Sequence, residues 1–60
     1  MTLEINKRYE VEVVEADGSR SYIRGISEAI DGHLLTLAFD GKTKVFNTAA
    51  STFVGLQEWR

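Results

Sequence analysis

The sequence predicts an all-β protein: a small, five-stranded, strongly bent antiparallel barrel with at most one short 3₁₀ turn. Three Asp-Gly pairs, Asp17-Gly18, Asp31-Gly32 and Asp40-Gly41, separate apolar runs that are rich in β-forming residues. Asp-Gly favours the type I′ turn, in which both central residues have φ above zero, and it is a strong hairpin signal. Sixty residues provide for one domain, residues 1–60, with a single core.

The first two strands carry the clearest patterns. Residues 2–6 are expected to form a turn or a short strand, and the first long strand begins at Arg8. The second strand covers residues 20–30 and is interrupted by Gly25. Since glycine within a strand often marks a bulge or a bend, we expect this strand to bend there and to serve both sides of the barrel. The first strand alternates between two faces, with Tyr9, Val11 and Val13 on one and Glu10, Glu12 and Val14 on the other.

Three further strands complete the expected barrel, at residues 33–39, 42–47 and 52–58. Residues 47–51 between the last two form a short connector before the closing strand. The expected inward residues of these strands are Leu35, Leu37, Phe39, Val45, Val54 and Leu56, which leaves Phe53 and Trp59 facing outward.

Composition restricts the classes of function. Seven Lys and Arg residues stand against nine Asp and Glu residues, and this net charge of −2 argues against a strongly electrostatic nucleic-acid binder. Five of the acids lie in residues 1–17, so one acidic and one mildly basic edge would suit head-to-tail contacts. With no cysteine and one histidine, His33, we expect neither a disulfide nor a metal site, and no cofactor. Self-association is then the expected support for so small a fold, unless a good core suffices.

The sequence also lacks the marks of a membrane or exported protein. It has no run of about 18 apolar residues, the length that a membrane span needs. Its first residues lack a positive region followed by an apolar stretch, as a signal peptide would have. We therefore expect a cytoplasmic protein with no membrane contact.

The order of strands and turns resembles the Sm-like and Src-homology-3-like barrels, and the closer likeness is to Sm-like proteins. Gly25 is followed by Ile30-Asp31 and Leu34-Leu35 at the spacing of the first Sm motif, and residues 17–20 resemble that family's first hairpin. Roughly residues 9–57 follow the pattern. The resemblance implies a bent barrel whose final strand closes against the first, and closure protects the strand edges of a small sheet. It also implies assembly into a ring or dimer, and RNA binding. Two positions depart from it, because Leu35 stands where the family has a base-binding asparagine, and residues 47–50 lack the Arg-Gly pair of the second motif.

Two sets of residues are candidate sites. Basic and aromatic side chains on strands can bind phosphates and stack on single-stranded bases, although a solvated strand face would look the same. Apolar residues at outward positions can form a partner or oligomer contact, or they can cover the open ends of a small barrel. The first set is Tyr22, Arg24, Lys42 and Lys44, and the second is Val14, Leu34, Phe53 and Trp59.

The sequence carries no catalytic constellation. His33 has no nucleophile or orienting partner nearby in the sequence, and catalysis needs both. Asp17, Asp31 and Asp40 are assigned to turns, where aspartate bonds to local backbone, rather than to a metal cluster. We expect a non-enzymatic binding and assembly module that forms a homo-oligomer and contacts a protein partner. The alternative is an Sm-like oligomer that binds RNA or single-stranded nucleic acid.

Overall fold

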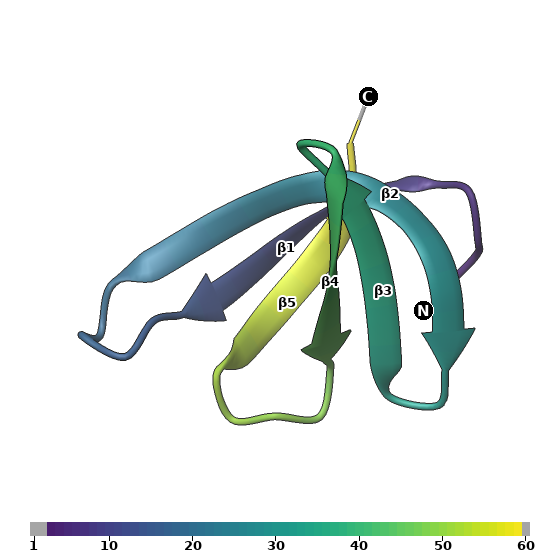
Figure 1. The fold of residues 1–60 in the computed structure, drawn as a ribbon. Helices are drawn as coiled ribbons and strands as arrows, with labels where there is room; N and C mark the ends of the chain where they lie inside the picture. The colour runs from purple at the N-terminus through teal and green to yellow at the C-terminus, as the bar shows by residue number, and fades with distance from the viewer. Residues whose placement is uncertain (1–2, 60) are drawn as a thin grey trace.

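The structure, a computed structural model, describes residues 3–59 and contains one antiparallel sheet (Figure 1). The sheet order is β4-β3-β2-β1-β5, so the last strand lies beside the first, as predicted. No helix occurs among the described residues, and the expected five-stranded all-β class is confirmed. The strands are β1 (Arg8–Val14), β2 (Arg20–Asp31), β3 (Leu34–Phe39), β4 (Lys42–Asn47) and β5 (Phe53–Glu58).

The long strand β2 arches over the other strands (Figure 1). From Arg20 to Ile26 it pairs with β1, and from Ile26 to Asp31 it pairs with β3. Gly25 lies beside this change of partner, and a register shift follows between Ser27 and Ala29. One bent strand therefore serves both halves of the fold, as the glycine predicted.

The sheet is curved but open. β4 and β5 are its two edge strands, and they do not pair with each other. The expected barrel is therefore not closed by hydrogen bonds within residues 3–59, and each edge strand keeps one unpaired side.

The three Asp-Gly pairs turn the chain, but in two ways. Asp40 (φ 51°) and Gly41 (φ 74°) both have positive φ, as a type I′ turn requires. At the other pairs only Gly18 (φ 88°) and Gly32 (φ 60°) do. In the first turn the Asp17 carboxylate instead accepts the Ser19 backbone N–H (2.9 Å) and hydroxyl (2.6 Å), which fixes the loop from the aspartate side chain.

The core lies on the concave side of the sheet, which we call the inner face. Its buried members come from β1, β3 and β4, and partly buried residues from the N-terminal turn and from β1, β2, β3 and β5 pack around them. The predicted inward faces of β1 and β3 are confirmed. The buried residues are Tyr9, Val11, Leu35, Leu37 and Phe46, and the residues packed against them are Leu3, Val13, Ile23, Ile30, Phe39, Phe53 and Leu56.

The predicted inward residue of β4 is wrong. Val45 is 56% exposed, and Phe46 is buried in its place. The two-residue turn pairs Phe39 with Lys42, so the register sets Phe46 opposite the inward Leu35 and Val45 opposite the outward Thr36.

The predicted faces of β5 are also wrong near its start. Val13 pairs with Phe53 but Glu12 pairs with Gly55, so Val54 is an extra residue in a bulge. A bulge interrupts the alternation of a strand, and Phe53 and Leu56 consequently both pack against the core. Val54, predicted inward, is 45% exposed.

The N-terminal segment forms a turn that is fastened to the end of the sheet. The fully buried Ser27 hydroxyl donates to the Glu4 carbonyl oxygen (2.5 Å) and accepts the Lys7 backbone N–H (3.1 Å). The Asn6 N–H donates to the Ser27 carbonyl (2.7 Å), and the Glu4 N–H donates to the Tyr9 hydroxyl (3.0 Å). The expected turn is confirmed for the residues seen, while Thr2 lies outside the described part. Among residues 3–59 we find no helix that is long and apolar enough to cross a membrane.

Candidate functional site

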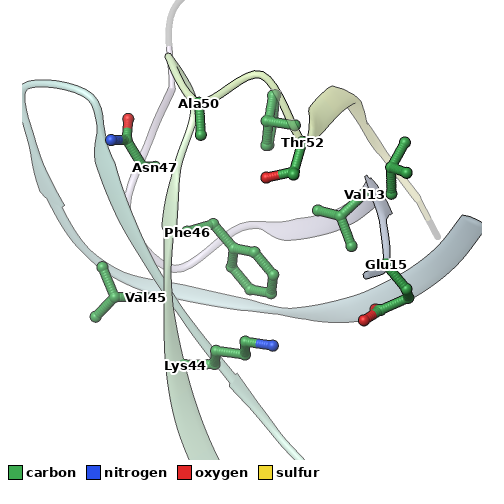
Figure 2. A pocket seen from close by; sticks show the side chains of 10 residues that line it. Val13, Glu15, Lys44, Val45, Phe46, Asn47, Ala50 and Thr52 are labelled. Atoms are coloured by element: carbon green, nitrogen blue, oxygen red, sulfur yellow. The ribbon is translucent and has the colours of Figure 1, made fainter. Parts of the chain in front are cut away.

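A cleft of about 260 Å³ lies between the two edges of the open sheet, and we call it the seam cleft. It is bounded by the end of β1, by β4, and by the turn that leads from β4 into β5. Figure 2 shows the Phe46 ring pointing into the hollow between these segments. The lining residues are Val13, Val14, Glu15, Lys44, Val45, Phe46, Asn47, Ala50, Thr52 and Phe53.

The floor of the seam cleft is apolar. Phe46 is only 5% exposed, and Val13 and Phe53 pack beside it as part of the core. Two successive turns shape the far wall, since Ala50 N–H donates to the Asn47 carbonyl (3.1 Å) and Phe53 N–H donates to the Ala50 carbonyl (3.1 Å). The cleft is smaller than the roughly 300–1,000 Å³ of typical small-molecule pockets. It therefore suits a side chain of a partner better than a cofactor.

Two charged side chains stand at the rim. The Lys44 ammonium lies 5.5 Å from the Phe46 ring centroid, a cation–π geometry, and Glu15 lies on the β1 side. Neither belongs to an ion pair within residues 3–59. Both charges are accordingly free to meet a partner.

Strand β4 also offers backbone groups. Thr48 N–H donates to the His33 carbonyl (2.8 Å), so residues 33 and 48 form a hydrogen-bonded pair. Such pairs alternate along an antiparallel ladder, which turns the backbone groups of Lys44 and Phe46 toward β3. The N–H and C=O groups of Thr43 and Val45 then point to the unpaired edge. An edge of this kind is a template for another strand.

The structure brings only part of the predicted partner contact together. Val14 and Phe53 both line the seam cleft, although Phe53 does so from the inner face. Leu34 is 43% exposed on the convex side, which we call the outer face. Trp59 lies beyond the end of β5, and its backbone N–H donates to the Arg8 carbonyl (3.2 Å).

Trp59 packs among arginines at its end of the sheet. The guanidinium carbons of Arg8 and Arg24 lie 5.5 Å and 5.1 Å from its ring centroid. Its indole N–H is buried without a hydrogen-bond partner in the described part of the chain. These contacts hold the end of β5 against β1 and β2.

The four predicted nucleic-acid residues do not form one surface. Tyr22 and Arg24 lie on the outer face of β2, opposite Glu12 and Glu10 of β1. Lys44 lies on the inner side of β4, where it pairs with the buried Leu37. Binding of single-stranded nucleic acid stays a prediction, but the four residues predicted for it do not share one surface. The remaining member, Lys42, lies over the Phe39 ring at 5.3 Å.

The outer-face arginines are already paired. Arg24 Nε donates to Glu10 (2.8 Å) and Arg20 donates to Glu12 (2.7 Å). The hydrogen bond from Arg24 lowers the pKa of Glu10, against the opposing effect of desolvation. The hydrogen bonds from Ser19 likewise lower the pKa of Asp17, in keeping with its role in the turn. Within residues 3–59 no group of three metal-ligating side chains comes together.

Sequence reasoning missed the residues that define the cleft, above all Phe46, Glu15 and Thr52. A signal for Phe46 was present, because a two-residue hairpin that points Phe39 inward also points Phe46 inward. No family model, curated protein or solved structure matches this chain.

Proposed function

We propose that the chain is a non-enzymatic binding and assembly module that associates with a second copy of itself at the seam cleft. The observation that carries this proposal is the open seam, in which two unpaired strand edges flank an apolar floor formed by Phe46. An unprotected edge beside apolar surface favours association. The small size of the chain adds to the benefit of burying more surface.

The seam gives two reasons to expect a second copy rather than an unlike partner. Each chain has a free β4 edge and a free β5 edge, so the β4 edge of one copy can pair with the β5 edge of another. β4 carries Lys42 and Lys44, while β5 ends in Glu58. A basic edge and an acidic end suit a head-to-tail contact, and complementary charge sets the register of an interface. Contact with a further macromolecule would use surface outside the seam.

Val45→Lys tests this proposal. Val45 lies at the rim with its side chain turned away from Phe46 (Figure 2) and is 56% exposed, so the fold should tolerate lysine. A charge on an edge strand blocks edge pairing. In sedimentation equilibrium over a range of concentrations, we expect the native chain to self-associate and the variant to do so at least tenfold more weakly, about 1.4 kcal/mol.

Ile26→Lys is the matched control. Ile26 is also an exposed aliphatic residue (45%), but it lies on the outer face of the central strand β2 and has no free edge. The Ile26→Lys variant should associate like the native chain. A native chain that keeps the mass of one copy at every concentration would end the proposal, as would equal effects of the two lysines.

A further inference from the structure

Ile5 is an exposed aliphatic side chain on a fixed support. It is 54% exposed, at the tip of the N-terminal turn. The backbone on both sides is held, since Glu4 and Asn6 each bond to Ser27. Asn6 has φ 64°, which closes the turn tightly. A side chain displayed on such a rigid turn loses little freedom on binding.

The seam cleft has the size and character of a receptor for one such side chain. Its floor is the Phe46 ring, and its volume is about 260 Å³. Within one chain the two cannot meet, because the turn precedes the start of β1 and the cleft lies at its end. Seven strand residues at roughly 3.3 Å each separate them by about 20 Å. Only another copy can place Ile5 in the cleft.

The charges beside the two features are complementary. The Glu4 side chain is 59% exposed next to Ile5, where it pairs with Lys7 at 2.9 Å. Lys44 stands over Phe46 at the rim and has no carboxylate partner within residues 3–59. Lys7 also pairs with Glu58 at 3.1 Å, so Glu4 shares its lysine with a second carboxylate. An exposed carboxylate that shares its lysine and a lysine without a carboxylate partner at the cleft favour one docking orientation.

We propose that Ile5 of one copy inserts over Phe46 in the seam cleft of a second copy, with Glu4 facing Lys44 of that copy. The inference rests on the proposed self-association and names the segment that occupies the cleft. The contact is heterologous, since the surfaces that meet are different, and it repeats from copy to copy until a ring closes. Its centre is an apolar side chain in a pocket, the usual form of an interface hot spot.

Ile5→Ser, measured by sedimentation equilibrium, tests the apolar part. We expect the dissociation constant to rise at least tenfold while the thermal unfolding curve stays within a few degrees of the native one. Ile26→Ser changes another exposed isoleucine, 45% exposed on the outer face, and should change the constant less than twofold. If Ile5→Ser associates like the native chain while Val45→Lys does not, the seam is an interface but Ile5 is not its occupant. A native chain that is monomeric throughout overturns both proposals.

A charge exchange tests the orientation. Glu4→Lys and Lys44→Glu should each weaken association several-fold, and the double variant should recover most of the loss. Coupling of this kind reports a direct pair across the interface. Glu4→Lys combined with Lys42→Glu is the control for net charge, because Lys42 lies on the same edge strand but does not line the cleft. This second double variant should not recover the loss caused by Glu4→Lys. Equal recovery in both double variants, or none in either, would overturn the facing of Glu4 and Lys44.

Discussion

Gly25→Ala should lower the free energy of unfolding by about 1–3 kcal/mol, the range for forcing extra atoms into packed structure. A Cβ at this position would lie 2.7 Å from the Ala38 carbonyl oxygen and 3.3 Å from the Leu37 Cβ. The oxygen belongs to the backbone of β3, so relief requires the sheet itself to shift. Gly25→Val adds two more carbons at the same place and should exceed the effect of alanine.

Gly55→Ala provides the matched control for this measurement. Gly55 also lies in a strand, but no atom lies within 4 Å of the place where its Cβ would stand. Its substitution should cost less than about 0.5 kcal/mol or add slight stability, because alanine restricts the unfolded chain. Urea unfolding of the three variants against the native chain measures the difference. Similar costs at Gly25 and Gly55 would show that β3 does not restrict Gly25.

Gly25 shows which features of the fold a local sequence pattern can predict and which it cannot. A break in the alternation predicted that β2 bends near Gly25, and it does. The close approach of Ala38 could not be predicted, because it depends on how β3 packs across the bend. The five strands followed from turn residues and alternation, which are local, whereas the pairing of β5 with β1 was expected from the resemblance to small barrels.

The predicted inward and outward residues of the last two strands were wrong for a different reason. One extra residue, Val54, reverses the alternation between Phe53 and Leu56. The neighbouring Gly55 is the kind of residue that often marks a bulge, but the faces of this strand were assigned by alternation alone. In β4, Val45 was assigned inward without use of the hairpin register, and that register places Phe46 inward instead. Errors of one residue exchange the two faces of a strand.

The candidate site was predicted only in fragments for the same reason. Val14, Lys44 and Phe53 were singled out on separate grounds, and the structure gathers them around one cleft. Their meeting depends on the open edge between β4 and β5. Whether a short sheet closes or stays open is set by strand curvature and register over the whole chain, so a linear pattern does not contain it. Leu34 and Trp59 lie elsewhere, and their contact role stays a prediction.

Ser27 should be the most sensitive polar residue of the fold. Ser27→Ala removes the hydroxyl that links the Glu4 carbonyl oxygen and the Lys7 N–H, and both groups lose this partner at a fully buried site. Leaving buried backbone groups unsatisfied costs about 1–3 kcal/mol. The loss should appear in urea unfolding, and hydrogen exchange should speed up at the amides of residues 4–7 more than in β1.

Ser21→Ala distinguishes this effect from the general loss of a strand serine. Ser21 lies on the same strand, and its hydroxyl makes no hydrogen bond within residues 3–59. The Ser21→Ala variant should therefore change stability by less than about 0.5 kcal/mol.

Because Ser27 also holds the turn that displays Ile5, Ser27→Ala should weaken self-association even where the sheet stays folded. If it lowers stability but leaves association unchanged, the fixed position of the turn matters to the fold alone, and rigidity is not what makes Ile5 a contact residue.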